Sequence, residues 1–236
     1  MKTKIIDKNY GSIPHLSTSK LTQQADKKIS LGQELIITKK TRDWKDLIIV
    51  TEKLDGSNVG IIKKDDKLIA ITRTGYPAIS SPYKQHILFD NYLQQNCDKF
   101  NWLPEGYRIC GEFMIQAHGT IYDISKVEDI FVSFDIFDEY NNRILYINFI
   151  KFCFKYGIST VPLLHIGQPI TIDRVLKILD KGHYGYPENP EGFVCRVERD
   201  NQVDFLAKWV RADKEDGKYL KGEEIWNKGI ERWFKI

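Results

Sequence analysis

Three short apolar runs, separated by turn sequences, constrain the fold of this chain more than any other feature. The runs are Leu47–Lys53, Val59–Lys63 and Leu68–Thr72, and Asp-Gly and Asp-Asp dipeptides lie between them. Runs of this length, joined by such turns, are typical of antiparallel strands. The sequence therefore predicts that the chain builds an antiparallel sheet, beginning near residue 47.

The remaining periodicity predicts an α+β class, because strands alternate with helical segments. Helices are expected at 83–96, at Ile144–Tyr156 and at Ile172–Leu179, the last with Thr171 or Asp173 as its N-cap. Further strands are expected at Leu35–Ile37, Arg108–Met114, Ile130–Phe137, Gly192–Val197 and Asp204–Val210.

Composition excludes several classes of protein. With 236 residues, of which 42% are hydrophobic, the chain can bury a substantial core. The formal charge of +3 is too small to indicate a nucleic-acid partner by itself. The four cysteines form no C-x-x-C pair, which argues against a zinc ribbon or a disulfide scaffold. No signal peptide or membrane-spanning run is found, so we expect a cytoplasmic protein.

Lys53 is the most informative single residue. A strand that stops at Lys53, just before the Asp55-Gly56 turn, would present its amine at the mouth of a pocket. Lysine is a nucleophile when neighbouring cations or partial desolvation favour its neutral form. By itself, a solvated lysine in a hairpin explains the pattern equally well.

Further motifs follow Lys53 along the chain. Arg73 lies in Thr-Arg-Thr-Gly, Glu112 follows Gly111, Glu191 precedes Gly192, and Lys208 lies in Leu-Ala-Lys-Trp-Val-Arg. With Lys53-Leu-Asp-Gly and the strand Phe131–Asp135, this order resembles the covalent nucleotidyltransferases, which comprise ATP-dependent ligases and capping guanylyltransferases. Within that superfamily the chain is most similar to RNA ligases of a phage and bacterial group.

The resemblance assigns the phosphate chemistry to three residues. It implies that Lys53 attacks the α-phosphate of ATP and carries AMP. Arg73 and Lys208 would hold phosphate oxygens and favour the neutral form of Lys53. A hard divalent cation favours carboxylate oxygen, so Glu191 would bind Mg²⁺ or Mn²⁺ directly or through water.

The remaining nucleotide contacts implied by the resemblance surround the nucleoside. Glu112 would accept hydrogen bonds from the ribose hydroxyls, and Phe134 would stack on the adenine, with Phe131 as the alternative. Asp55 would shape the turn, and the backbone around Glu52 would contact the purine edge.

The resemblance implies an architecture as well as a site. We expect an α+β nucleotidyltransferase (ATP-grasp-like) domain of antiparallel sheets flanked by helices at 1–211, with a wrapping segment at 1–40. A short helical tail at 212–236 would leave no room for an OB-fold domain. The family often has a second lysine two residues from the last motif lysine, but Leu206 and Val210 occupy those positions, and Arg211 is a possible substitute.

The expected function is that of an ATP-dependent RNA ligase, which joins a 3′-hydroxyl to a 5′-phosphate through lysyl-AMP and an adenylylated 5′ end. Its partners would be ATP and RNA ends or a nicked duplex, and no membrane or obligatory protein partner is expected. The alternatives are a DNA ligase, a guanylyltransferase or a catalytically silent nucleic-acid-binding relative. Candidate phosphate contacts are Lys39, Lys40, Arg42, Lys84, Arg211, Lys214 and Lys218.

Overall fold

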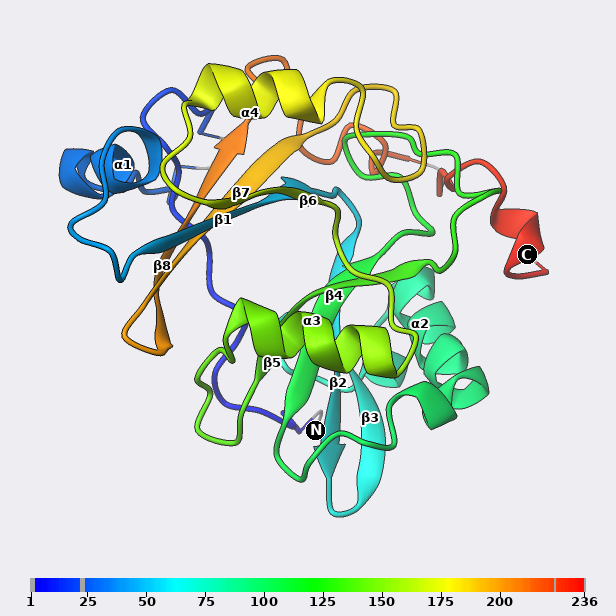
Figure 1. Ribbon diagram of the computed structural model, residues 1–236. Helices are drawn as coiled ribbons and strands as arrows, with labels where there is room; N and C mark the ends of the chain where they lie inside the picture. Colours follow the sequence, from blue (N-terminus) through cyan, green and yellow to red (C-terminus); the bar gives the residue numbers. More distant parts are fainter. Residues whose placement is uncertain (1–2, 22–23, 223, 236) are drawn as a thin grey trace. The chain divides into compact units, whose positions relative to one another are not determined.

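The computed structural model describes residues 3–21, 24–222 and 224–235. The chain divides into two compact units, each with its own sheet. The first unit comprises Met1–Gly11, Gly56–Gln116 and Glu128–Thr160, and the second comprises Ser12–Asp55, Ala117–Val127 and Val161–Ile236. Because each sheet within the described residues is antiparallel and helices pack on it, the α+β prediction is confirmed (Figure 1).

The sheet of the first unit has the strand order β3-β2-β4-β5. Its strands are β2 (Ser57–Lys64), β3 (Lys67–Thr72), β4 (Arg108–Phe113) and β5 (Phe131–Phe137), and its helices are α2 (Lys84–Gln95), α3 (Tyr146–Lys155), η1 (Ala78–Ser80) and η2 (Cys97–Lys99). Asp65 and Asp66 both have positive φ, 52° and 58°. That conformation defines the two-residue hairpin turn that the Asp-Asp dipeptide predicts.

An aromatic cluster forms the core of the first unit, where α2 packs on the sheet. Phe89 of α2 lies 5.1 Å from Phe113 and 5.5 Å from Phe131, measured between ring centroids. All three side chains are fully buried. Aromatic residues bury large areas, so this cluster holds the helix on β4 and β5.

The sheet of the second unit has the strand order β6-β1-β7-β8. Its elements are α1 (Leu31–Thr38), β1 (Leu47–Lys53), β6 (Leu163–Gly167), α4 (Ile172–Leu179), β7 (Gly192–Arg199), β8 (Gln202–Val210) and η3 (Ile230–Arg232). Asp200 and Asn201, with φ of 49° and 61°, form the two-residue turn between β7 and β8. Figure 1 shows α4 lying across one face of this sheet, and Val175 and Leu179 of the helix belong to the same buried hydrophobic cluster as Val50 and Phe193.

Two predicted elements differ from the structure, and one strand was not predicted. The segment expected as a strand at Leu35–Ile37 is helix α1, because Ser30 and Gln33 form a capping box that starts a helix. Strand β6 was not predicted, since it is an edge strand whose Leu163 and Ile166 side chains are half exposed and lack clear alternation.

The tail expected to be helical contains only the 3-10 turn η3 among its described residues. Gly217, Gly222 and Gly229 have positive φ, which interrupts a helix. The segment instead hydrogen-bonds to 117–124, for example from Ile124 N–H to the Lys228 carbonyl at 2.8 Å. No helix within the described ranges is long and apolar enough to cross a membrane.

Candidate active site

Lys53 is the last residue of β1, and its side chain enters a cluster of charged groups. Its Nζ lies 2.6 Å from Oε2 of Glu191, which immediately precedes β7. The register pairs Lys53 with Gly192, so the neighbouring Glu191 comes within reach of the amine. Glu191 is buried, with 3% of its surface exposed, and the ion pair is therefore poorly screened by water.

Gly192 permits the close pairing that places Glu191. Its φ is +156°, and a Cβ built there would overlap the carbonyl oxygen of Trp209 on β8. Gly192 pairs with Lys53 on one side and with Val210 on the other. The Glu191-Gly192 motif thus has a steric reason, because only glycine fits where three strands meet.

Lys214 completes the cluster from the segment after β8. Its Nζ lies 2.5 Å from Oδ2 of Asp55 and 3.2 Å from Oε1 of Glu191. The Lys214 side chain is fully buried, so its assignment to a nucleic-acid surface was wrong. The N–H of Gly119 also donates to Asp55 Oδ2, at 2.7 Å.

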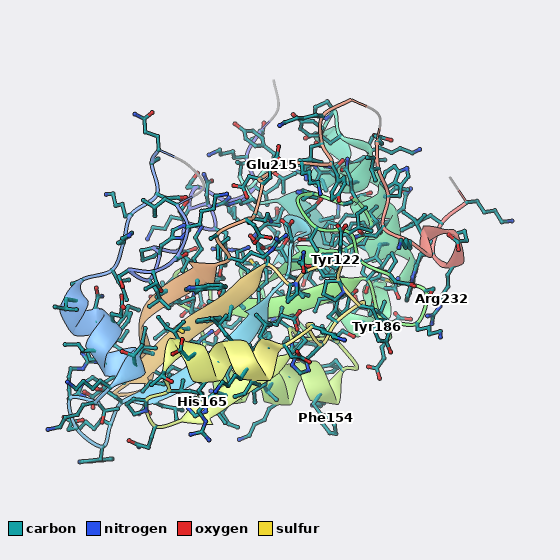
Figure 2. All side chains as sticks on the ribbon, turned by 90° about the horizontal axis from the view of Figure 1, so that it is seen from above. Tyr122, Phe154, His165, Tyr186, Glu215 and Arg232 are labelled. Carbon is teal, nitrogen blue, oxygen red and sulfur yellow. The ribbon has the colours of Figure 1, made fainter. Side chains whose placement is uncertain are left out.

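Asp55 is fixed by its backbone as well as by its carboxylate. Its N–H donates to the hydroxyl oxygen of Tyr122 at 3.1 Å. Tyr122 is fully buried among other side chains, and its own N–H donates to Asn227 Oδ1 (Figure 2). Burial raises the pKa of Asp55, but the Lys214 and Lys53 ammonium groups lower that pKa overall. Tyr122 therefore has a structural role that the sequence did not predict.

Lys208 lies on the same face of the sheet as Lys53. The registers place Thr51, Val194 and Lys208 opposite one another across β1, β7 and β8. Directly opposed residues share a face, and Lys53 follows Thr51 by two positions, which returns it to that face. Burial, followed by the nearby Lys53 charge, lowers the pKa of Lys208.

An N-terminal segment secures the outer side of β8 at Lys208. The Lys208 N–H donates to the Pro14 carbonyl at 2.9 Å, and Leu16 N–H donates to the Lys208 carbonyl at 2.8 Å. Between them, the fully buried His15 contacts Ser19 Oγ at 2.7 Å and Asp26 Oδ2 at 3.2 Å.

Glu52 points away from Lys53, since neighbouring residues of a strand face opposite sides of a sheet. Its Oε2 accepts the His183 N–H at 2.7 Å, whereas Oε1 is buried with no hydrogen-bond partner. Burial raises the pKa of Glu52 to about 7. Its backbone N–H already donates to the Pro162 carbonyl, at 2.9 Å.

Three predicted contacts belong to the first unit: Arg73, Glu112 and Phe134. Glu112 is half-buried on β4, opposite Asn58. Arg73 is exposed after β3, and its Nε donates to the Tyr10 carbonyl at 3.2 Å.

Phe134 differs from every other residue of β5 because it is only partly buried. The register with β4 shifts at this residue, which is the extra residue of a β-bulge. The bulge interrupts the alternation expected for Val132, Phe134 and Ile136. Tyr10 packs edge-on against the Phe134 ring at 5.1 Å. Phe131, the alternative platform, lies in the aromatic core of the unit.

Solved structures of RNA ligases share this fold. An archaeal ATP-dependent RNA ligase has a TM-score of 0.55 at 16% identity, covering 86% of this chain and 48% of that one. A Naegleria gruberi RNA ligase with pyrophosphate has a TM-score of 0.54 at 17% identity, covering 88% and 59%. A variant of the Naegleria enzyme, solved with ATP and Mn, has a TM-score of 0.55 at 16% identity, covering 89% and 60%. The fold is thus that of the nucleotidyltransferase domain of RNA ligases.

The family follows from the sequence match. The RNA ligase family model matches residues 46–210, and the chain belongs to this family. An uncharacterized protein of Methanocaldococcus jannaschii is 29% identical, over 64% of this chain and 38% of that protein. The chain therefore spans 38% of the length of that relative and 48% of that of the archaeal ligase.

Proposed function

We propose that this protein is an ATP-dependent RNA ligase that uses Lys53 to carry AMP. The observation that carries the proposal is a strand-end lysine in a buried group of charges, within a chain of the RNA ligase family. Neighbouring structures contain ATP with Mn, or pyrophosphate, which supports ATP as the nucleotide. A DNA ligase or a guanylyltransferase is less well supported, because the matching family and structures are those of RNA ligases.

In the first step, the Nζ lone pair of Lys53 forms a bond to the α-phosphorus of ATP. The bond from that phosphorus to the oxygen bridging to the β-phosphate breaks, and its electron pair leaves with pyrophosphate. The ammonium loses one proton before the attack and the nitrogen loses another after it, both to solvent. The product is a lysine–AMP phosphoramidate.

Arg73 and Lys208 are proposed to hold the phosphate oxygens during this step. Lys208 is suited to the task because it is partly buried on the same sheet face as Lys53, where a positive charge is weakly screened. Arg73 has an exposed guanidinium, whose fork of N–H donors matches phosphate geometry.

Glu191 is proposed to bind a divalent cation, directly or through water. Mg²⁺ usually keeps several waters and binds through one or two carboxylates and substrate phosphates, so the single buried carboxylate of Glu191 suits it. The bound cation would neutralise phosphate charge, and Glu191 orients it.

The nucleoside contacts are proposed for Glu112, Phe134 and the backbone near Glu52. The partial exposure of Phe134, at a bulge that turns it out of the strand pattern, supports its role as adenine platform over that of Phe131. Glu112, half-buried on a strand, supplies a carboxylate for the ribose hydroxyls.

The later steps require RNA. An RNA 5′-phosphate oxygen attacks the phosphorus of lysyl-AMP, the N–P bond breaks, and the amine recovers a proton. A 3′-hydroxyl then attacks the adenylylated 5′ end, loses its proton, and AMP leaves. Candidates for contacts with the RNA phosphates are the exposed lysines Lys39, Lys40, Lys84 and Lys218. Arg42 and Arg211, which were also predicted, are paired with aspartates. All four cysteines are free thiols, which supports the reducing cytoplasm as the location.

Labelled ATP and magnesium test the proposal. The wild-type protein should acquire a covalent label that persists on denaturation, and Lys53→Ala should acquire none. Lys63→Ala, which alters another partly buried strand lysine, should be labelled like the wild type. A wild-type protein that no nucleotide labels would refute the proposal. Labelling by GTP, or sealing of nicked DNA but not of RNA, would favour the alternatives.

A further inference from the structure

Lys214 is a buried cation for which the sequence motifs provide no role. It follows the last residue of β8, Val210, by four positions, and its side chain is fully buried.

The Lys214 ammonium is held in place from several directions. It contacts Asp55 at 2.5 Å, Glu191 at 3.2 Å and the half-exposed Asp216 at 4.0 Å. A Cβ on Gly119 would overlap Cε of Lys214, so that glycine makes room for the side chain. The Lys214 carbonyl accepts a hydrogen bond from Lys20 Nζ, at 2.5 Å. These contacts hold the buried Lys214 ammonium in one place, where water screens its charge poorly.

Glu191 is shared between two lysines. Its Oε2 contacts Lys53 and its Oε1 contacts Lys214. Lys214 therefore fixes the carboxylate that faces the proposed nucleophile and, through its other contact, fixes Asp55 in the Lys-x-Asp-Gly turn.

The charge of the cluster changes when Lys53 takes up AMP. Before transfer, Lys53 and Lys214 balance Asp55 and Glu191, so the four side chains sum to zero. After transfer, Lys53 has lost its positive charge and its phosphoryl group carries one negative charge, which makes the sum −2. Without Lys214 the sum would be −3 beside the largely buried carboxylates of Asp55 and Glu191. Lys214 is thus needed more in the adenylylated protein than in the free protein.

We propose that Lys214 is a positioning residue that stabilises lysyl-AMP, by holding Asp55 and Glu191 in place and by balancing the charge added with the AMP phosphate. The inference rests on the proposed function.

The test is the equilibrium between lysyl-AMP and pyrophosphate. Protein that carries labelled AMP on Lys53 is titrated with pyrophosphate at a fixed concentration of ATP. The midpoint is the pyrophosphate concentration that removes half of the label. Lys214→Met should lower this midpoint by at least about tenfold, and Lys214→Arg, which keeps the charge, should recover part of the loss. Lys221→Met, an exposed lysine of the same segment, should leave the midpoint unchanged.

The midpoint separates this role from a purely structural one. Misfolded protein lowers the total label but does not alter the midpoint of the folded fraction. If Lys214→Met does not fold, Lys214→Gln, which can still hydrogen-bond Asp55, is titrated in its place. If the Lys214→Met or Lys214→Gln variant has the same midpoint as the wild type, the inference is overturned. If the wild type itself forms no covalent adduct, the proposed function is refuted instead.

Discussion

The two ends of β1 carry ion clusters that use the same charges for different purposes. At the start, the buried Asp46 accepts hydrogen bonds from Arg42 and Arg199, which also pair with Asp204 and Asp43. At the end, Lys53 and Lys214 share Glu191, and Lys214 also contacts Asp55. One cluster is built from arginines and the other from lysines.

Arginine and lysine suit different roles in the two clusters. Arginine has a rigid fork of donors and remains protonated, so Arg42 and Arg199 can tie the strand ends together but cannot act as nucleophiles. Lysine is a point charge with a removable proton. The comparison predicts that exchanging one cation for the other has little effect at the first cluster and abolishes function at the second.

The largest expected effect is that of Lys53→Arg. The variant keeps a positive charge facing Glu191 but has no amine that can attack phosphorus, so labelling by ATP should vanish. Since Lys53 is partly exposed, the free energy of unfolding should change by less than about 1 kcal/mol. Labelling and a urea melt of the same preparation measure both. A labelled Lys53→Arg protein would exclude Lys53 as the nucleophile.

Asp46→Ala should have the largest effect on stability. It leaves two arginines without their shared buried carboxylate, which should cost about 3 kcal/mol in the free energy of unfolding. Labelling per folded molecule should stay within about twofold of the wild type, because the change lies at the other end of β1.

The same residue predicts acid sensitivity. Burial raises the pKa of Asp46, but hydrogen bonds from Arg42 and Arg199 lower it overall. A lowered folded-state pKa gives stability that is present above the unfolded value of about 3.9 and is lost as the pH falls below it. Urea melts between pH 6 and 2 should show this loss of stability in the wild type and a smaller loss in Asp46→Ala. If the free energy of unfolding fell equally with pH in the two proteins, Asp46 would not be the source of the acid sensitivity.

Glu52→Gln should act in the opposite pH direction. The pKa of Glu52 is raised to about 7 by burial, so the folded protein binds its proton more tightly than the unfolded chain. Its contribution to stability is present below the unfolded value of about 4.3 and is lost as the pH rises through 7, by roughly 3–4 kcal/mol. The wild type should lose stability from pH 5 to 8 relative to Glu52→Gln. If the free energy of unfolding, from urea melts, changed equally with pH in both proteins, Glu52 would ionise in the folded protein with no loss of stability.

The smallest expected effect is that of Arg199→Lys. The charge remains, but the paired contacts to Asp43 and Asp46 are reduced to one, which should cost about 1 kcal/mol in the free energy of unfolding. Labelling should be unaffected. Thermal melts of Arg199→Lys and Lys53→Arg, measured side by side, compare the loss of stability at the two ends of β1. A loss of labelling in Arg199→Lys would show that the two ends of β1 are coupled.

Much of the fold was predictable because local signals agreed with it. Leu47–Lys53 and Ile172–Leu179 have the predicted bounds, and Thr171 is the N-cap of α4. The hairpin turn at Asp65-Asp66 has the backbone that its residue types favour. Leu35–Ile37 was wrong because three apolar residues do not distinguish a strand from a helix, and the capping box at Ser30 decided for the helix.

The motif order brought Lys53, Glu191 and Lys208 into one hypothesis before any geometry was known, and the second unit holds all three on adjacent strands. Lys214 could not be found in this way. Its separation from Asp55 in the sequence is long, and a lysine followed by Glu and Asp is typical of an exposed turn. Its burial depends on the room left at Gly119.

The sequence by itself determined the family, the class of fold and the residue proposed to carry AMP, because strand periodicity and motif order are local properties that survive without a structure. Only the tertiary structure decided which charges surround that residue. Ion pairs such as Lys214 with Asp55 and Lys53 with Glu191 join residues that are far apart in the chain, and their strength depends on burial, which no local pattern specifies.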